Sequence, residues 1–197
     1  MQIWRKSSIF ADGMRIERWI LRLFGWKVVG AELMQGVAKS VMVMAPHTAY
    51  RDAIIGRLAL QSIGLKSRLL GKKELFFFPM NIAMYAIGGM PIRGIKGQNS
   101  VVHVAHILKE ADSLHTVICP EGGFAPTDKW SLGFLYMARR ANVPVSVAYL
   151  DFKTKTAGIK DVIYDLDDDK AVMRRLRDDY DGVTAHVPEW FVLPNVS

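Results

Sequence analysis

Short apolar runs bounded by turn residues alternate along the chain with longer segments of helical periodicity. Runs of the first kind indicate buried strands, whereas apolar residues three and four positions apart indicate helices. Strands that alternate with helices predict an α/β fold, in which helices flank a central, mostly buried mixed sheet. The expected strands are 41–45, 67–71, 116–120 and 143–152, and the expected helices are 14–26, 52–64, 100–111, 132–141 and 167–180.

Length and composition fit one globular domain. The 197 residues are half hydrophobic and 23% charged, a balance that allows a sizeable buried core. No linker or repeat interrupts the pattern, so we expect residues 1–197 to form a single domain. The one cysteine, Cys119, cannot form an intramolecular disulfide, and a reducing compartment is the simplest interpretation.

The net charge of +7 predicts an anionic partner. A positive mean hydropathy, with 10 Met and 5 Trp, favours a lipid surface over nucleic acid. The basic residues cluster beside apolar runs, whereas a nucleic-acid binder would present a basic stripe with exposed aromatic residues. We therefore expect an anionic membrane surface as a partner and no nucleic acid. No signal peptide is expected, because no clean apolar core follows the first charges.

The helix expected at about 14–26 is basic and amphipathic, which is typical of a helix at a membrane interface. A helix that only packs on the domain would show the same pattern, so both interpretations stay open. Its apolar face would consist of Met14, Trp19, Ile20, Leu23 and Phe24. The basic residues beside that face are Arg15, Arg18 and Arg22.

The segment 75–92 holds 18 residues without a charge, a marginal length for crossing a membrane. Pro79, Asn81 and the Gly88–Gly89 pair argue against a continuous span. We expect a broken helix at a membrane surface or along a groove for an acyl chain. The alternative is an ordinary buried core helix.

The sequence APHTAYRD (45–52) contains His47 and Asp52, which lie five positions apart. On a regular helix that spacing places two side chains roughly 140° apart, so they meet only if the helix begins after His47. Pro46 ends the preceding strand and Thr48 is a good N-cap residue, which allows this geometry. An aspartate on one ring nitrogen would leave the other nitrogen as a general base. The alternative is a turn histidine near an aspartate at a helix start.

Two glycine-containing segments are further candidate binding sites. In CPEGGF (119–124), Glu121 precedes Gly122 and Gly123, which permit close backbone approach to a ligand and whose amides can hold an anion. An ordinary turn at a strand end is equally compatible with that sequence. In GGMPIRG (88–94), Arg93 could bind phosphate or only cap the preceding helix.

The His47/Asp52 pair, GGMPIR, PEGG and VPVSVAYLDF occur in an order and approximate spacing that resemble four motif blocks of the glycerophospholipid acyltransferases, the 1-acylglycerol-3-phosphate acyltransferase family. A short bacterial branch with a similar APHT opening is the nearest match, and the resemblance runs from about Val28 to Asp151. It implies transfer of a fatty acyl group from acyl-CoA or acyl carrier protein to a hydroxyl of a lysophospholipid-type acceptor, in phospholipid biosynthesis.

The resemblance also implies roles for single residues. His47 would deprotonate the acceptor hydroxyl and Asp52 would hold His47, with no metal and no other cofactor. Separately, the basic N-terminal helix and the segment 75–92 predict peripheral attachment to the cytoplasmic side of the inner membrane. The residues expected to bind substrate are Glu121, Gly122, Gly123, Arg93 and Lys96.

The chain departs from the family at two places. Gly123 and Phe124 stand where the third block usually has threonine and arginine, and Gly94 stands where the second block usually has a further arginine. Those arginines are linked to the acceptor's phosphate, and a charge-assisted hydrogen bond is worth roughly 1.5–3 kcal/mol. Either Arg93 and Lys96 compensate, or the acceptor is a lipid without that phosphate.

Two other classes of function remain open. One is a membrane-binding protein of the same fold with altered catalysis, which the departures favour and the intact His47, Asp52 and Glu121 oppose. The other is a cysteine hydrolase that uses Cys119, against which the apolar strand end around the thiol argues.

Overall fold

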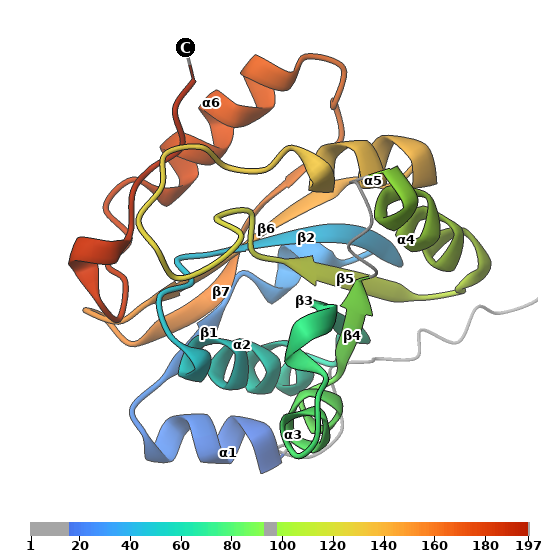
Figure 1. Cartoon of the computed structure of the whole chain (residues 1–197). Coiled ribbons are helices and arrows are strands. Elements are labelled where there is room, and N and C mark those ends of the chain that lie inside the picture. The colour runs from blue at the N-terminus through green and yellow to red at the C-terminus, as the bar shows by residue number, and fades with distance from the viewer. Residues whose placement is uncertain (1–15, 93–97, 197) are drawn as a thin grey trace, which may run out of the picture.

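A seven-stranded sheet runs through the computed structural model, which describes residues 16–92 and 98–196 (Figure 1). The strand order is β1-β7-β6-β2-β5-β3-β4, and every neighbouring pair is parallel except β6 and β7. The strands are β1 Lys27–Val29, β2 Lys39–Ala45, β3 Ser67–Lys72, β4 Gly89–Ile92, β5 Leu114–Ile118, β6 Val145–Asp151 and β7 Thr156–Ile163.

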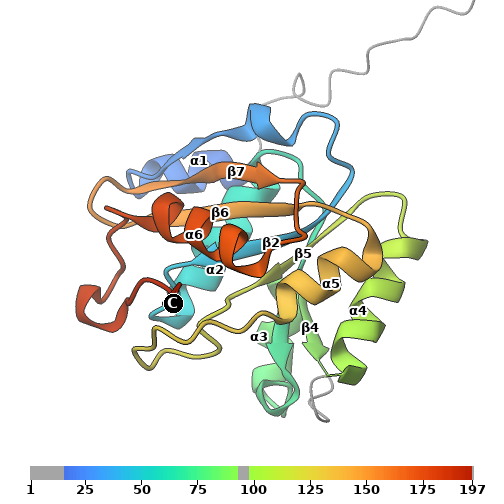
Figure 2. The ribbon, with the colours of Figure 1, turned by 90° about the horizontal axis from the view of Figure 1, so that it is seen from above.

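Helices cover both faces of the sheet, as Figures 1 and 2 show. One layer contains α1 Ile16–Leu23, α2 Tyr50–Ser62 and α3 Met80–Ala86, and the other contains α4 Gln98–Glu110, α5 Gly133–Ala141 and α6 Asp169–Tyr180. The short 3-10 helices are η1 Ala31–Met34, η2 Lys73–Leu75 and η3 Pro188–Trp190. This architecture confirms the α/β fold with a central, mostly buried mixed sheet.

The apolar run at the end of β2 is explained by its central position. Successive side chains of a strand point to opposite faces of the sheet. Val41 and Val43 pack in the cluster that contains α5 and α6 residues, whereas Met42 and Met44 pack on the opposite face with Leu60 of α2. Since helices cover both faces, both sets of side chains are apolar and buried.

The strands expected at 41–45, 67–71, 116–120 and 143–152 correspond to β2, β3, β5 and β6, and the structure adds β1, β4 and β7. β4 was not predicted because Pro91 argues against a strand. The proline is tolerated there because β4 lies at one edge of the sheet. β7 was obscured by Gly158. A Cβ built there would lie 2.6 Å from the carbonyl oxygen of Val29 on β1, so a close strand approach imposes the glycine.

The segment 75–92 is interrupted, as expected, and no residue of α3 is buried. The alternative interpretation, a buried core helix, is therefore wrong. Phe77 and Phe78 are 58% and 78% exposed. Within the described parts of the chain, no helix has both the length and the apolar character needed to cross a membrane.

The N-terminal amphipathic helix is shorter than the expected 14–26. The observed α1 spans Ile16–Leu23, and Met14 and Arg15 lie outside the described residues. α1 buries Leu21 against the domain but leaves Trp19 and Leu23 exposed to solvent. Packing of one face on the domain agrees with one of the two interpretations that the sequence left open. A role at a membrane interface stays a prediction.

Tyr180 at the end of α6 should contribute to stability through its hydroxyl. The ring is fully buried, and the hydroxyl lies 2.8 Å from the carbonyl oxygen of Ala148 and 3.1 Å from that of Val43. Tyr180→Phe should lower the free energy of unfolding by about 1–2 kcal/mol, since it removes a buried hydrogen bond. Urea unfolding measures this, with Tyr164→Phe on an exposed ring as the control. Equal stability of the two variants would contradict the prediction.

Candidate active site

His47 and Glu121 lie at the carboxyl ends of two adjacent parallel strands. β2 ends at Ala45 and β5 at Ile118, so the loops that follow emerge at the same edge of the sheet. The backbone N–H of His47 donates a hydrogen bond of 3.1 Å to Oε1 of Glu121. Such edges are where ligands bind in open α/β sheets.

The turn between β2 and α2 brings His47 toward Asp52. Since α2 begins at Tyr50, His47 precedes the helix and Asp52 lies in its first turn. His47 Nδ1 is 3.7 Å from Asp52 Oδ2, closer than two faces of one helix would allow but longer than the roughly 3.2 Å limit of a good N–H···O bond. The expected direct hydrogen bond is thus absent from this geometry. Catalytic hydrogen bonds often tighten when substrate binds.

Asp52 also starts the helix, a role that the sequence assigned to Thr48. Oδ2 of Asp52 accepts the backbone N–H groups of Thr48 and Ala49 at 2.7 and 2.8 Å. Thr48 is not the N-cap, which is Ala49. The hydroxyl of Thr48 instead accepts the backbone N–H of Val187 at 3.2 Å. The expected N-cap is therefore corrected: one carboxylate satisfies the helix start and faces the histidine.

Burial shifts the pKa values of the histidine and its aspartate partner in opposite directions. The His47 side chain is 20% exposed, and burial lowers its pKa to about 4, so the ring is neutral at pH 7. Burial raises the pKa of Asp52, which is only 2% exposed, while the backbone bonds from Ala49 and Thr48 oppose that rise. A neutral imidazole next to a hydrogen-bonded carboxyl group is the state that a general base requires.

Glu121 is a second buried acid at the same site. Burial raises its pKa to about 7, the hydrogen bond from the His47 backbone lowers it, and the charge of Asp52 raises it. Its Oε2 is buried and has no hydrogen-bond partner among the described residues. Glu121 can therefore be protonated near neutral pH, and Oε2 retains capacity for a ligand.

Phe124 forms an apolar wall beside the histidine. Its ring centroid lies 4.9 Å from that of His47 and 4.8 Å from that of Tyr50, the latter in an edge-to-face arrangement. The sequence identified Phe124 only as a departure from the family pattern. The contact with His47 could not be foreseen, because it depends on how the loop after β5 folds back over the loop after β2.

The glycines after Glu121 have different roles. Gly122 has φ +72°, and its N–H donates to the carbonyl of Cys119 at 3.2 Å, so this amide is used within the turn. Neither Gly122 nor Gly123 has an atom within 4 Å of a built Cβ. The backbone here is open to a ligand, but the expected anion contact cannot come from the amide of Gly122.

In the second motif block the glycines serve packing. Gly88 has φ +79° and lies against the guanidinium of Arg57, and a Cβ on Gly89 would come within 2.6 Å of the Met84 carbonyl oxygen. Arg57 itself donates to the backbone and hydroxyl oxygens of Ser67, which ties α2 to β3. Arg93 and Lys96 lie outside the described residues, so their place at the site stays a prediction.

The C-terminal segment 184–187 packs beside the site, which the sequence did not indicate. In addition to the bond from Val187 to Thr48, the ring of His186 lies 5.0 Å from that of Phe152. Phe152 N–H donates to the Thr184 carbonyl at 2.9 Å. The segment has neither helical nor strand periodicity, so only its histidine could have drawn attention to it.

The site does not favour thiolate chemistry. Burial raises the pKa of the Cys119 thiol well above its usual range, and the carboxylates of Glu121 and Asp52 raise it further. A nucleophilic cysteine needs the opposite environment, so the cysteine hydrolase interpretation loses its support. Within the described residues, no group of three or more His, Cys, Asp or Glu side chains could hold a metal ion.

A mixed α/β sheet thus carries a histidine and two carboxyl groups where the carboxyl ends of two neighbouring strands meet. The family model Acyltransferase matches residues 26–150, and the chain belongs to this acyltransferase family. This confirms the family resemblance drawn from the four motif blocks. No curated protein matches the chain.

Among solved structures, the chain is similar to the 1-acyl-sn-glycerophosphate (LPA) acyltransferase PlsC from Thermotoga maritima, with a TM-score of 0.50 and 17% identity. The match covers 75% of this chain and 65% of that protein. At this identity the likeness shows a shared fold. The chain matches less than two thirds of the length of PlsC, so substrates do not follow from the likeness.

The buried Glu121 should make stability depend on pH. Its pKa is raised from 4.5 to about 7 on folding, so its contribution is fully present below about pH 4.5 and is lost as pH rises through about 7. Glu121→Gln keeps an oxygen for the His47 N–H and cannot ionise. The wild-type protein should therefore lose more stability than the variant between pH 4.5 and 8. Urea unfolding across this range measures the difference, and parallel pH profiles would show that Glu121 does not titrate as stated.

Proposed function

We propose that the chain transfers a fatty acyl group from acyl-CoA or acyl carrier protein to a hydroxyl of a lysophospholipid-type acceptor, 1-acylglycerol-3-phosphate or a related lipid. Acyl transfer follows from the family, whereas the donor, the acceptor and the mechanism are the proposal. The observation that supports it is the position of His47. Its neutral ring faces Asp52, and its backbone N–H donates a hydrogen bond to Glu121.

The geometry suits a direct transfer without an acyl-enzyme. Nδ1 of His47 faces Asp52, which leaves Nε2 to take the proton of the acceptor hydroxyl. The alkoxide oxygen attacks the thioester carbonyl carbon and forms the new ester bond. As the tetrahedral intermediate collapses, the carbon–sulfur bond breaks, and the leaving thiolate takes the proton from the imidazolium. Asp52 stabilises the transient positive charge on the ring.

The acceptor would lie against the loop after β5. Oε2 of Glu121 lacks a partner among the described residues and could bind an acceptor hydroxyl, while the open backbone at Gly123 allows close approach. Arg93 and Lys96 are the proposed contacts to an acceptor phosphate. They follow β4, whose carboxyl end lies at the same edge of the sheet as that of β3.

A second acceptor class is a lipid without a terminal phosphate. Phe124 favours it, because an apolar ring beside His47 occupies the position where the family usually has an arginine. A neighbouring phosphate would also face two acidic side chains, Glu121 and Asp52. The alternative of a membrane-binding protein of the same fold with altered catalysis gives no reason for the arrangement of these acids around a neutral histidine.

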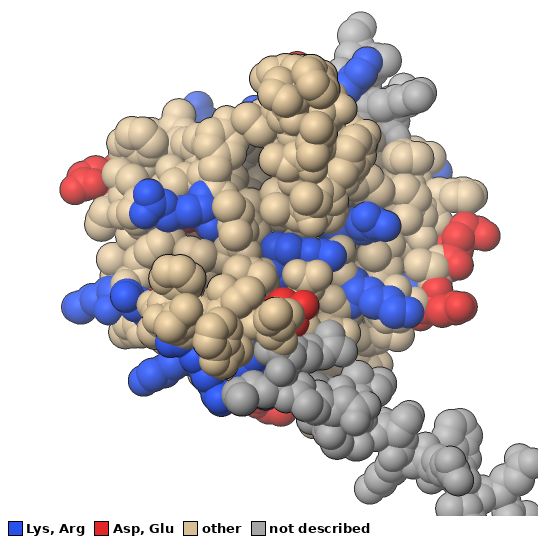
Figure 3. Space-filling view, turned by 90° about the horizontal axis from the view of Figure 1, so that it is seen from below, with Lys and Arg blue, Asp and Glu red and all other residues tan. Residues whose placement is uncertain are grey.

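We also propose that the protein binds peripherally to an anionic membrane surface, on the cytoplasmic side of the inner membrane. α1, whose side chains Trp19 and Leu23 are exposed, lies on the same face of the sheet as α3. The exposed Phe77 and Phe78 directly precede α3 in the chain. Figure 3 views this face, across which Lys and Arg side chains outnumber Asp and Glu. Apolar residues beside cations suit an interface with anionic lipid.

His47→Ala should abolish acyl transfer, since a general base contributes about 10²–10⁴-fold to rate. Asp52→Asn should also lower kcat strongly, because it removes the charge that orients and stabilises the imidazole. Release of free thiol from acyl-CoA or acyl carrier protein, with a lysophospholipid acceptor, measures both. His103→Ala and Asp167→Asn, on exposed side chains, are the matched controls. Full activity of His47→Ala would rule out the mechanism.

The pairs Trp19→Ser/Leu23→Ser and Phe77→Ser/Phe78→Ser should each weaken binding to vesicles, because they remove apolar side chains that would enter the interface. Wild-type binding should increase with anionic lipid and decrease with salt. Vesicle flotation measures this, with Tyr136→Ser/Tyr164→Ser on other exposed surfaces as the control. A wild-type protein that stays in the soluble fraction with acidic vesicles at low salt would overturn the membrane proposal.

A further inference from the structure

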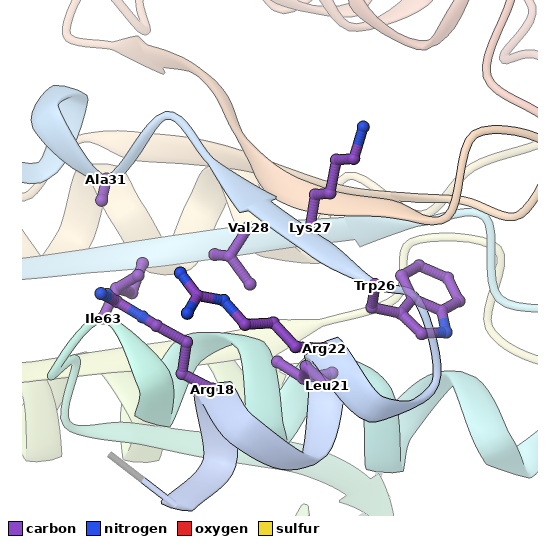
Figure 4. Close-up of a pocket in the computed structure, with 8 residues that line it drawn as sticks. All are labelled: Arg18, Leu21, Arg22, Trp26, Lys27, Val28, Ala31 and Ile63. Atoms are coloured by element: carbon purple, nitrogen blue, oxygen red, sulfur yellow. The ribbon is translucent and has the colours of Figure 1, made fainter. Parts of the chain in front are cut away.

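A cavity of about 280 Å³ lies between α1 and β1 (Figure 4). It is separate from the catalytic residues, because it reaches Ile63 beyond the C-terminal end of α2, whereas Asp52 lies in the first turn of that helix. The ten residues from Asp52 to Ser62 span roughly 15 Å. The lining residues are Arg18, Leu21, Arg22, Trp26, Lys27, Val28, Ala31 and Ile63.

The charged side chains known to line this cavity are all basic. Among the described residues, three that line it are basic and none is acidic. Figure 4 shows the side chains of Arg18 and Arg22 reaching from α1 into the space below β1, while Lys27 extends from the strand away from the helix. Nη2 of Arg18 donates to the carbonyl oxygen of Ser62 at 3.2 Å, which holds the guanidinium at the cavity. A guanidinium has five N–H donors, so this bond uses a small part of its capacity.

The remaining walls of the cavity are apolar, and an apolar surface adjoins it. Leu21 and Trp26 are buried in the domain. Trp19 and Leu23 are exposed and directly follow the two arginines, so they lie about 100° further round the helix. If these side chains enter a membrane interface, the guanidinium groups lie beside them at the depth of lipid headgroups.

The cavity is near the lower limit of about 300 Å³ for small-molecule sites. That size suits one small headgroup better than a nucleotide-bearing donor such as CoA. Paired arginines match phosphate oxygens in geometry and charge. We propose that this cavity binds the phosphate group of an anionic membrane lipid, whose acyl chains remain in the bilayer. The inference rests on the proposed membrane association and adds a specific lipid contact to it.

The variant Arg18→Lys/Arg22→Lys tests the site, because it keeps the positive charge of α1 and removes the planar guanidinium groups. Vesicles of phosphatidylcholine with phosphatidic acid are the probe. The variant should bind them at least about 10-fold more weakly than the wild-type protein, the loss expected from one charge-assisted hydrogen bond. Arg140→Lys/Arg174→Lys, on α5 and α6, is the matched control and should bind like the wild-type protein.

Photocrosslinking locates the lipid directly. Phosphatidic acid with a diazirine near the headgroup should label peptides within residues 16–31 of the wild-type protein, and labelling should fall at least about 10-fold in Arg18→Lys/Arg22→Lys. Labelling that is equal in both proteins would show general attraction to surface charge and would overturn the site. Circular dichroism melting confirms that both variants are folded.

Two further measurements separate the alternatives. Glycerol 3-phosphate has the same phosphate group without acyl chains; if it binds as tightly as the vesicles, the ligand is a soluble phosphate and the lipid assignment is wrong. Acyl transfer between a short-chain donor and a short-chain acceptor in solution should be equal in the wild-type and Lys variants. Loss of vesicle binding with intact transfer therefore supports the lipid site, and absent transfer in both proteins would count against the catalytic proposal alone.

Discussion

The carboxylate of Asp52 connects the fold to the chemistry. Its Oδ2 accepts two backbone N–H groups at the start of α2 and faces Nδ1 of His47. The first N–H groups of any helix lack partners within the helix, so the carboxylate would stabilise α2 without a histidine nearby. The same bonds oppose the effect of burial on its pKa and favour the charged form. Helix formation therefore places a carboxylate in position before any substrate binds.

Burial is also the largest cause of the pKa shifts of the three titratable groups at the site. Burial lowers the pKa of His47 and raises those of Asp52 and Glu121, because every ionised form loses hydration. The two acids differ in their hydrogen bonds: Asp52 accepts two backbone N–H groups, whereas Glu121 accepts one. One acid is thereby better suited to remain charged beside the histidine, and the other to be protonated near neutral pH. Phe124 adds to this effect, since its ring keeps water from one side of His47.

Periodicity was sufficient to predict the parts of the fold that the hydrophobic effect determines. β2 contains a continuous apolar run over 41–45, and β5 and β6 are mostly apolar, because all three strands are covered on both faces. Such patterns are visible in the sequence. β7 was not predicted because it contains Gly158, which is unusual in a strand. The glycine is required by close contact with Val29, a residue distant in sequence. The proximity of His47 and Asp52 could be predicted since it is local. The packing of Phe124 and of the Val187 segment could not, because it depends on how separate loops meet at the edge of the sheet.

The arrangement of α2 gives the membrane proposal a structural consequence. Its first turn holds Asp52, while its last residue, Ser62, accepts a hydrogen bond from Arg18 on α1. One helix thus joins the edge of the sheet that carries His47 to the element with the exposed Trp19 and Leu23. Phe77 and Phe78 follow the carboxyl end of β3, which lies at the same edge as His47. A membrane that contacted both α1 and the Phe77–Phe78 segment would extend along α2. The bilayer would then lie next to His47 only at the N-terminal end of that helix. A lipid acceptor could then present its hydroxyl to His47 while its acyl chain stayed in the membrane.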